Sequence, residues 1–506
     1  MVGGEVRLHQ THSGLRDGGG IDRGALGSYT ETMGLMCRVF RLAVMVCVLC
    51  LGAWPAAAQG DAHGAATARA FARLRDDPVR LLAFLAAMPK GADLHNHLDG
   101  AINAEDFVAH AVAVGLCIDV GQHAIRRPPC TKQDPPAGEA LARDAGLRDA
   151  MIDALSMRGF VAVPGGETGH DHFFATFAKF HEAAADDPGA LMATEARRAA
   201  AEHIAYLEIM WTPHVRSAIG LAATMRWQGD DFAADLAALG GGLRGLVARA
   251  RAETDAAEAR KDALLGCGTP RAQPGCGVVI RFQAYSLRTF PPAAVFAQMA
   301  FDFALAAADP RYVGVNIVAP EDDKVAVRDY TLHMRALGFF HHAYPAIKLS
   351  LHAGELAPGL VAADALRFHI RQAVEIAGAS RIGHGTDVMG EQDSAGLLAE
   401  MAHGHVAVEI NLTSNAQILG VQGAAHPFGS YRRAGVPVVI CTDDEGVERT
   451  TLTDEYVRAA ETWHLSYGEL KSLSLASLRY SFLPAGEKAR LEGRLDAAFR
   501  AFEERF

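Results

Sequence analysis

The chain has 506 residues, of which 50% are hydrophobic and 21% are charged, so it can bury a large core and extensive disorder is not expected. Its formal net charge of −11 and the absence of a long basic run argue against a nucleic-acid-binding surface. A bound cation and a neutral or cationic substrate fit that charge better. The length is ordinary for one elaborated α/β barrel.

The first 58 residues form a leader that carries a secretory signal over residues 33–58. Arg38 and Arg41 precede an apolar run over residues 42–54, and small residues follow that end at Ala58. This order is typical of a signal peptide, and the apolar run is too short to span a bilayer. We therefore expect a periplasmic or secreted protein, cleaved near Ala58 and not inserted in a membrane afterwards. Because a signal peptide normally begins at the N-terminus, translation could start at Met33 or Met36 as well as at Met1.

Three of the eight cysteines lie in the leader. Cys117 and Cys130 flank a Pro-rich loop, and Cys267 and Cys276 flank a Gly/Pro-rich loop. Two local pairs in an oxidising compartment predict two disulfides. A zinc site built from these four cysteines is the alternative, although no Cys-x-x-Cys spacing supports it. Cys441 lies in an apolar strand-like run and is expected to be a buried free thiol.

Residues 59–88 predict an N-terminal helical extension. Over residues 89–506, eight apolar, strand-like runs alternate with helical patterns rich in alanine, leucine and arginine. The runs are 92–98, 205–210, 277–284, 312–318, 348–352, 381–384, 406–412 and 436–442. Strands that alternate with helices imply parallel strands joined by right-handed crossovers. Eight such units predict an α/β fold, a (β/α)8 TIM barrel whose active site lies at the C-terminal ends of its strands.

Two stretches of the barrel exceed a simple connection between elements. Residues 101–200 are mostly helical, with a Pro-rich loop near residues 127–129, and we expect an elaborated helical loop that covers the site. Residues 250–276 are first charged and then rich in glycine, cysteine and proline. They predict a surface insertion whose role the sequence leaves open.

Metal-ligand residues stand at the ends of three predicted strands. His95 and His97 are two residues apart on the first strand, so both side chains point into the barrel. His352 ends the fifth strand, and Asp443 ends the last. Three imidazole nitrogens, one carboxylate and a water molecule make a catalytic zinc shell with an exchangeable position. We therefore expect one Zn²⁺ per chain.

Three further polar residues lie beside these ligands. Glu355 follows His352 by three residues, and a carboxylate next to the metal site is suited to proton transfer. His384 stands between two glycines at a strand end, where it can approach a water molecule closely. Asp444 points away from its neighbour Asp443 and therefore faces the substrate. Each alone is more often a core histidine or a turn carboxylate, but their joint occurrence on several strands makes that reading improbable.

These segments resemble the motifs of the adenosine deaminase family, within the amidohydrolase superfamily. The matching motifs are His95-Asn96-His97-Leu98-Asp99-Gly100, Ser350-Leu351-His352-Ala353-Gly354-Glu355, Arg381-Ile382-Gly383-His384-Gly385-Thr386, Thr413-Ser414-Asn415 and Thr442-Asp443-Asp444. The resemblance runs from about residue 88 to about residue 480. The signal, the cysteine-bearing loop and residues 313–322 are nearer to the secreted adenosine-deaminase-related growth factor branch.

The resemblance implies zinc-dependent hydrolytic deamination of adenosine or 2′-deoxyadenosine to the inosine product and ammonia. Its implied zinc ligands are His95, His97, His352 and Asp443. Glu355 would protonate the purine N1, and His384 would orient the attacking water and help to deprotonate it. Asp444 would contact the purine on its N7 side, and Asp99 the ribose. The amide of Ala319, where the family typically has glycine, would face N3, with a tighter pocket there.

Two other readings remain open. One is an amidohydrolase that acts on adenine, a modified aminopurine nucleoside or another cyclic amidine or amide. The other is a secreted binding or signalling protein with a vestigial site, although such a site should have lost at least one of the residues named above. The Cys-rich signature of zinc deaminases that act on nucleic-acid bases is not evident, so we expect a small-molecule substrate. The sequence leaves the oligomeric state open.

Overall fold

The computed structural model describes residues 55–229 and 231–506. The predicted signal peptide therefore lies outside the described residues, apart from residues 55–58 at the start of α2 (Pro55–Leu74). Among the described residues, no helix is both long enough and apolar enough to span a bilayer.

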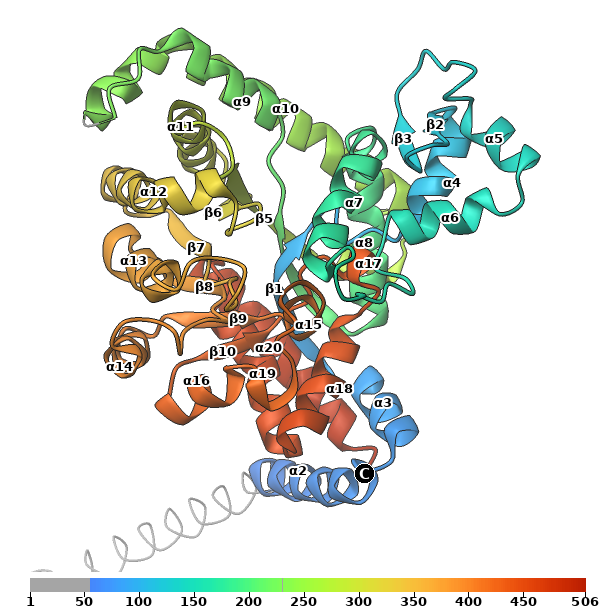
Figure 1. The fold of residues 1–506 in the computed structure, drawn as a ribbon. Coiled ribbons are helices and arrows are strands. Elements are labelled where there is room, and N and C mark those ends of the chain that lie inside the picture. Colours follow the sequence, from blue (N-terminus) through green and yellow to red (C-terminus); the bar gives the residue numbers. More distant parts are fainter. Residues whose placement is uncertain (1–54, 230) are drawn as a thin grey trace, which may run out of the picture. The chain divides into compact units, whose positions relative to one another are not determined.

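Eight parallel strands form one sheet, in which each strand pairs with the next strand of that sheet. Figure 1 labels these strands. The strands are β1 (Lys90–His97), β4 (Ile204–Met210), β5 (Val279–Leu287), β6 (Tyr312–Val318), β7 (Lys348–Ala353), β8 (Arg381–His384), β9 (Ala407–Ile410) and β10 (Val438–Ile440). The sheet curls until the chain after β10 meets β1, where the Asp443 amide donates to the His95 carbonyl at 2.8 Å. The predicted (β/α)8 barrel is confirmed.

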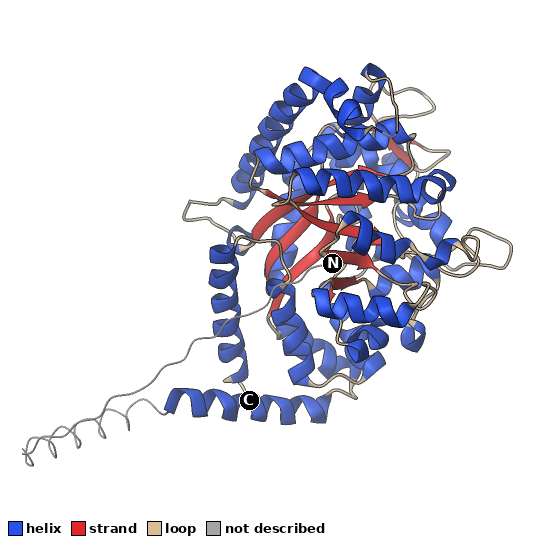
Figure 2. Cartoon of the chain, turned by 90° about the vertical axis from the view of Figure 1, so that its left-hand side faces the viewer, coloured by secondary structure: helices blue, strands red, loops and turns tan. Residues whose placement is uncertain are grey.

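Helices surround the strands and complete the barrel, as Figure 2 shows. Those that follow β4 are α9 (Val215–Leu221), α10 (Phe232–Leu265), α11 (Pro292–Ala308), α12 (Lys324–Ala343), α13 (His369–Gln372), α14 (Ser394–Gly404), α15 (Leu412–Leu419), α16 (Phe428–Ala434), α17 (Glu445–Glu448), α18 (Leu452–Trp463), α19 (Tyr467–Arg479) and α20 (Ala485–Glu503). Because helices cover the outer face of the strands, apolar side chains on that face are buried, while buried polar side chains such as Glu208 and Arg381 lie on the strands as well. In β7, for example, the fully buried residues Leu349 and Leu351 alternate along the strand with the buried polar residues Ser350 and His352.

The long connection after β1 forms its own subdomain. It contains α4 (Ala104–Val114), β2 (Cys117–Asp119), β3 (Ala124–Arg126), α5 (Ala137–Arg143), α6 (Leu147–Ala154), α7 (Gly169–Ala184) and α8 (Pro188–Ala201). A second apolar cluster holds it together, with the rings of Phe107 and Phe180 stacked at 4.8 Å. The predicted helical loop is present, but β2 and β3 also form a short antiparallel hairpin that the sequence did not indicate.

The N-terminal extension consists of α2 and α3 (Pro78–Ala87). The side chain of Asp77 begins α3 by accepting the amides of Val79 and Arg80, and Pro78 occupies the first turn, where a missing N–H costs nothing. Lys90, buried at the start of β1, donates to the Leu85 carbonyl at 2.8 Å at the other end of this helix.

Residues 250–276 are not the separate surface insertion that we expected. Residues 250–265 are the second half of α10, the crossover helix between β4 and β5. Ala250, Thr254 and Ala257 are buried, and the Thr254 hydroxyl bonds the Tyr312 hydroxyl at 2.9 Å. The charged residues belong to the solvent face of an amphipathic helix, which explains the error. Only residues 266–276 leave the helix, as a loop that includes the short helix η2 (Pro274–Gly277).

Both predicted disulfides are present. Cys117–Cys130 and Cys267–Cys276 have Cα–Cα distances of 5.4 and 5.6 Å, and Cys441 is a buried free thiol. Because the four sulfurs are bonded in pairs, they do not form the alternative zinc site.

We predict that each disulfide stabilises the fold. Replacing either pair by two serines should lower the free energy of unfolding by about 3 kcal/mol, because the unfolded chain then regains loop freedom. Chemical denaturation with and without reductant measures the change. Reductant should destabilise the parent but add nothing in a variant that lacks both pairs, and equal stability of parent and variants under oxidising conditions would contradict the prediction.

Candidate active site

The four residues predicted to bind metal come together at the C-terminal ends of the strands. His95 and His97 lie on β1, His352 lies on β7, and Asp443 follows β10. His95, His352 and Asp443 are buried, whereas His97 is half-buried on the wall of a cavity. The barrel therefore assembles ligands that are about 350 residues apart in sequence, as the predicted strand order requires.

The spacing of the ligand atoms fits a tetrahedral zinc shell. The Nε2 atoms of His97 and His352 are 3.3 Å apart, and Asp443 Oδ1 lies 3.3 Å from Nε2 of both His95 and His97. Zinc–nitrogen and zinc–oxygen bonds of about 2.0–2.1 Å place tetrahedral ligands about 3.3–3.4 Å from one another. The three distances of 3.3 Å between these ligand atoms match that edge length.

The charge at this position also fits a bound cation. Burial would raise the pKa of the Asp443 carboxyl, but the positive charge of His95 holds it well below its usual range. Burial lowers the pKa of His95, yet the carboxylates of Asp443 and Glu409 outweigh this effect and raise it to about 10. Without a metal, a proton on His95 thus balances the buried carboxylates. A divalent cation would take over this role and release the proton.

Two residues that the sequence analysis did not identify orient the histidine ligands. Glu409 on β9 accepts from Nδ1 of His95 at 2.7 Å, and Asn316 on β6 accepts from Nδ1 of His352 at 2.9 Å. Each bond leaves the Nε2 atom free to face the centre, which is how metal-binding histidines are usually held. Glu409 was detectable as the one charged residue in the apolar run 406–412.

Glu355 lies beside the ligands as a buried carboxylic acid. Burial and the nearby charges of Asp443 and Glu321 raise its pKa well above the usual range, which favours the protonated form. Its Oε1 atom is 3.8 Å from Nε2 of His384. A protonated carboxyl at the edge of a cavity can act as a general acid.

The loop that carries Glu355 is fixed by its backbone. Glu321 accepts the amides of Gly354 and Glu355 at 3.1 and 2.9 Å. Gly354 has a φ of +73°, and a Cβ at this position would lie 2.4 Å from Oδ1 of Asp387. Only glycine fits there, so the His-Ala-Gly-Glu order serves both the metal ligand and the acid.

His384 sits between the ligands and Glu355. Its Nε2 atom is 3.7 Å from Asp443 Oδ2, and its Nδ1 atom faces the side-chain amides of Asn415 at 3.0 Å and Asn411 at 3.3 Å. Burial lowers the pKa of His384 to about 3. One of its nitrogens lies within 4.8 Å of the ligand atoms of His95, His352 and Asp443, so the distances also admit His384 in the metal shell. Its separation from Asp443 exceeds the tetrahedral edge and favours a place beside the shell.

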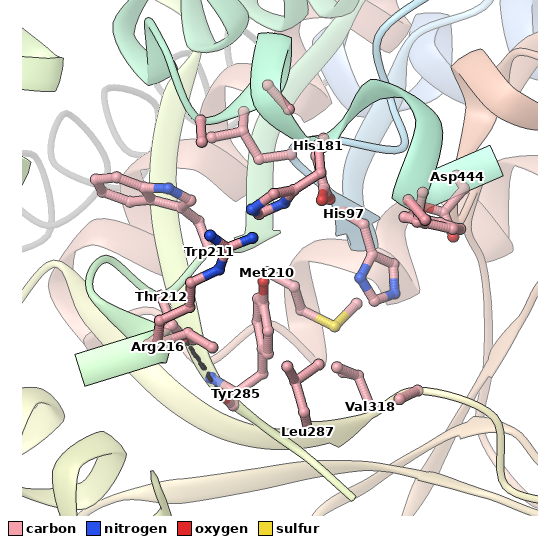
Figure 3. A pocket seen from close by; sticks show the side chains of 18 of the residues that line it. His97, His181, Met210, Trp211, Thr212, Arg216, Tyr285, Leu287, Val318 and Asp444 are labelled. Carbon is pink, nitrogen blue, oxygen red and sulfur yellow. Dashed lines mark hydrogen bonds between the residues drawn. The ribbon is translucent and has the colours of Figure 1, made fainter. Parts of the chain in front are cut away.

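These residues border a cavity of about 880 Å³, which is within the range of small-molecule sites. Phe173, Phe174 and Phe177 of α7 also line it, so the subdomain after β1 supplies part of the wall, as expected from the sequence. Figure 3 shows His97 and Asp444 on one side of the cavity and Trp211 with Arg216 on the other.

The three residues predicted to contact substrate all line this cavity: Asp99, Asp444 and Ala319. Burial and the charge of Asp443 raise the pKa of Asp444 well above its usual range, and its Oδ1 atom has no hydrogen-bond partner within the described part of the chain. Gly100 makes room for it, because a Cβ there would lie 1.5 Å from Asp444 Oδ1. Asp444 is therefore available to bond a ligand.

Three site residues adopt backbone conformations that favour glycine. The φ angles are +67° at Asp443, +65° at His384 and +83° at Ala319. His384 is the last residue of β8, Ala319 directly follows β6, and Asp443 lies three residues after β10. At each place a left-handed residue interrupts the regular alternation of side chains. Such strain is typical of functional sites. At Ala319, the alanine keeps a conformation that glycine would adopt without cost.

The sequence of this chain is similar to those of known deaminases. The family model described as adenosine deaminase matches residues 267–498. An adenosine deaminase of Enterococcus faecalis is 37% identical over 155 residues, which is 30% of this chain and 42% of that protein. An adenine deaminase of Rhizobium leguminosarum is 30% identical over 230 residues, which is 45% of this chain and 65% of that protein. The chain thus matches less than two thirds of the length of these relatives.

Solved structures share the fold. Adenine deaminase from Arthrobacter aurescens has a TM-score of 0.53 at 18% identity and covers 81% of this chain and 98% of its own. An Arabidopsis ADAL structure, complexed with IMP, has a TM-score of 0.55 at 18% identity and covers 83% of this chain and 99% of its own. The chain is therefore similar to the adenosine deaminase family over residues 267–498, and it shares the barrel fold of these solved structures.

Proposed function

We propose that this chain is a zinc-dependent hydrolase that removes the exocyclic amine of adenosine or 2′-deoxyadenosine as ammonia. The observation that supports it most is that three distances among the four ligand residues equal a tetrahedral edge, beside the carboxyl of Glu355, whose pKa is raised, at one cavity. The residues that hold the metal are His95, His97, His352 and Asp443. When bound there, zinc supplies Lewis-acid chemistry that lowers the pKa of a water molecule toward neutrality.

The residues of the chain then divide the remaining work. Glu355 donates its proton to the ring nitrogen next to the attacked carbon, so that negative charge does not build up on the ring. His384 orients the attacking water. Asp444 bonds the purine on its N7 side, while Asp99 and the backbone of Ala319 contact the ribose and N3. Attack by the water oxygen forms the new C–O bond. Of the two water protons, one restores Glu355 and the other goes to the amine, so the C–N bond breaks, ammonia leaves and the oxo product remains.

Another amine-bearing substrate is the first alternative. The relatives include an adenine deaminase and an N6-methyl-AMP deaminase of Bos taurus, the latter 38% identical over 113 residues. The cavity of about 880 Å³ exceeds what a nucleoside fills, so it also accommodates larger aminopurines. A binding or signalling protein with a vestigial site is the second alternative, and the complete set of site residues argues against it.

Ammonia release from adenosine, 2′-deoxyadenosine, adenine and N6-methyl-AMP by zinc-replete protein tests the proposed activity. We expect the highest kcat/KM for the two nucleosides. A preference for adenine or for the nucleotide would instead support the amidohydrolase alternative. No ammonia from any of them, with zinc bound, would support the vestigial site.

Single substitutions test the division between metal binding and proton transfer. Glu355→Gln should keep zinc and lose about 10²–10⁴-fold in kcat, with a much smaller change in KM, because glutamine cannot donate a carboxylic proton. His352→Ala should lose both zinc and turnover, whereas His384→Ala should keep most of its zinc. Metal analysis and steady-state kinetics decide the matter. If Glu355→Gln loses zinc as His352→Ala does, Glu355 is a ligand and this assignment is wrong.

Glu409→Gln should weaken zinc binding about 10–100-fold, because the neutral amide is a poorer acceptor for His95 Nδ1. Competition with a chelator measures the affinity. Glu391→Gln is the matched control: Glu391 is also buried, but it accepts the backbone amides of Ile370 and Arg371, away from the ligands. An unchanged zinc affinity in Glu409→Gln, or the same loss in Glu391→Gln, would contradict the role of Glu409.

We further propose that the protein is exported and belongs near the secreted growth factor branch. The order of basic, apolar and small residues before Gln59 supports export, and so do the two disulfides, which persist in oxidising compartments. N-terminal sequencing of protein from the native host should place the mature start near Gln59. Material that still begins upstream of Leu42 would contradict export by this signal.

A further inference from the structure

A chain of buried polar groups connects the backbone at Phe428 with the ring of His384. It begins where the Phe428 amide donates to Nδ1 of His426 at 3.2 Å. Because a backbone N–H can only donate, this ring nitrogen accepts and carries no proton. The proton of the His426 ring is therefore on Nε2.

The next link fixes the orientation of a side-chain amide. Nε2 of His426 lies 3.0 Å from Oδ1 of Asn415, to which it donates. With its oxygen bound on this side, Asn415 presents its NH₂ group to Nδ1 of His384 at 3.0 Å. The NH₂ group of Asn411 faces the same nitrogen at 3.3 Å.

Two N–H donors at Nδ1 of His384 leave no place for a proton on that atom, so the ring carries its proton on Nε2. This Nε2 atom is fully buried and has no hydrogen-bond partner among residues 55–229 and 231–506. It lies 3.8 Å from Glu355 Oε1 and 3.7 Å from Asp443 Oδ2, on the wall of the active-site cavity. The Nε2–H group of His384 thus lies at the cavity wall near the carboxyl groups of Glu355 and Asp443.

The segment that carries the two asparagines is itself anchored. Glu455 accepts the amides of Leu412 and Thr413 at 2.8 and 3.1 Å, which holds the first turn of α15. Asn411 immediately precedes this helix and Asn415 lies within it. The helix start is therefore fixed independently of His384.

We propose that His426 is a positioning residue that acts through Asn415 to set the tautomer of His384. In this tautomer, Nε2 of His384 donates a hydrogen bond to the attacking oxygen and has no lone pair with which to accept a proton from it. His384 then stabilises the charge that develops on the oxygen instead of serving as the base that the family resemblance implies. This inference rests on the proposed deaminase function.

The hydrogen bonds from His426 through Asn415 to His384 form a relay, and two substitutions test it, one by moving the proton of His384 and one by removing a donor. Asn415→Asp puts a carboxylate opposite Nδ1 of His384, which draws the proton to Nδ1 and turns Nε2 into an acceptor. His426→Leu removes the donor that holds Asn415. His426→Gln is the conservative variant, because its amide nitrogen reaches about the position of the imidazole Nε2 and can still donate to Asn415.

The tautomer is read directly from two-bond nitrogen–proton correlations of protein labelled with ¹⁵N-histidine, metal-free and zinc-loaded. The signals of His384 are assigned by their loss in His384→Ala. We expect the Nε2–H form in the parent and in His426→Gln, and the Nδ1–H form in Asn415→Asp. The Nδ1–H form in the parent would overturn the proposal.

Kinetics provide the second measurement. Loss of a preorganised donor costs about 10²–10³-fold in turnover, so kcat should fall by this factor in Asn415→Asp, with KM and zinc content near those of the parent. His426→Leu should lose part of its kcat, and His426→Gln should recover most of it. A parental kcat in Asn415→Asp, or equal losses in His426→Leu and His426→Gln, would overturn the proposal.

His333→Gln is the matched control. His333 is also a buried histidine, on α12, and its ring nitrogens have no hydrogen-bond partner in the described part of the chain. Its replacement should change neither the tautomer of His384 nor kcat. If the parent releases no ammonia from any aminopurine, the proposed function fails, whereas the tautomer measurement still decides the relay by itself.

Discussion

The barrel closes through the backbone of a residue whose side chain belongs to the site. The Asp443 amide donates to the His95 carbonyl at 2.8 Å, and its carbonyl accepts the His97 amide at 3.3 Å. The carboxylate of the same residue lies 3.3 Å from both imidazoles. Closure of the sheet therefore also brings together the side chains of His95, His97 and Asp443. Every other feature of the active site depends on this contact between the first strand and the last.

Below the ligands, the barrel interior is a network of paired charges and not an apolar core. Arg381 on β8 bridges Glu409 on β9 and Glu208 on β4, and burial without such partners would be costly for each of them. Burial opposes the ionisation of Glu409, yet Arg381 and His95 lower its pKa to about 2, so the carboxylate stays charged and holds His95 in place. Satisfied networks of this kind fix side chains in one arrangement. The ion pairs of Arg381 with Glu409 and Glu208 therefore help to hold the ligand His95 in a fixed position.

The strands were predictable because they are short apolar runs with a polar residue at the end, and residues 312–318 and 381–384 match the structure at both ends. The ligands were predictable for the same reason. Asn316, which orients the ligand His352, was not, because the partner of its side chain depends on which strands meet in space. The hairpin of β2 and β3 has only three residues per strand, too few for a pattern. Residues 250–265 were misread as an insertion because their charges lie on the solvent face of α10, whereas Ala250, Thr254 and Ala257 are buried.

Residues with positive φ angles near the strand ends are strained, and this strain places particular groups in the site. At Asp443 and His384, a positive φ brings a functional side chain to the centre, and a cost of about 1–2 kcal/mol for each is small beside the pairing of eight strands. Ala319 has the same kind of conformation, but its methyl group carries no chemistry. The methyl group of Ala319 forms part of the cavity wall, and a glycine at this position would leave the cavity wider there. The strain at Ala319 therefore bears on which ring fits the cavity, whereas the strain at the other two bears on the reaction itself.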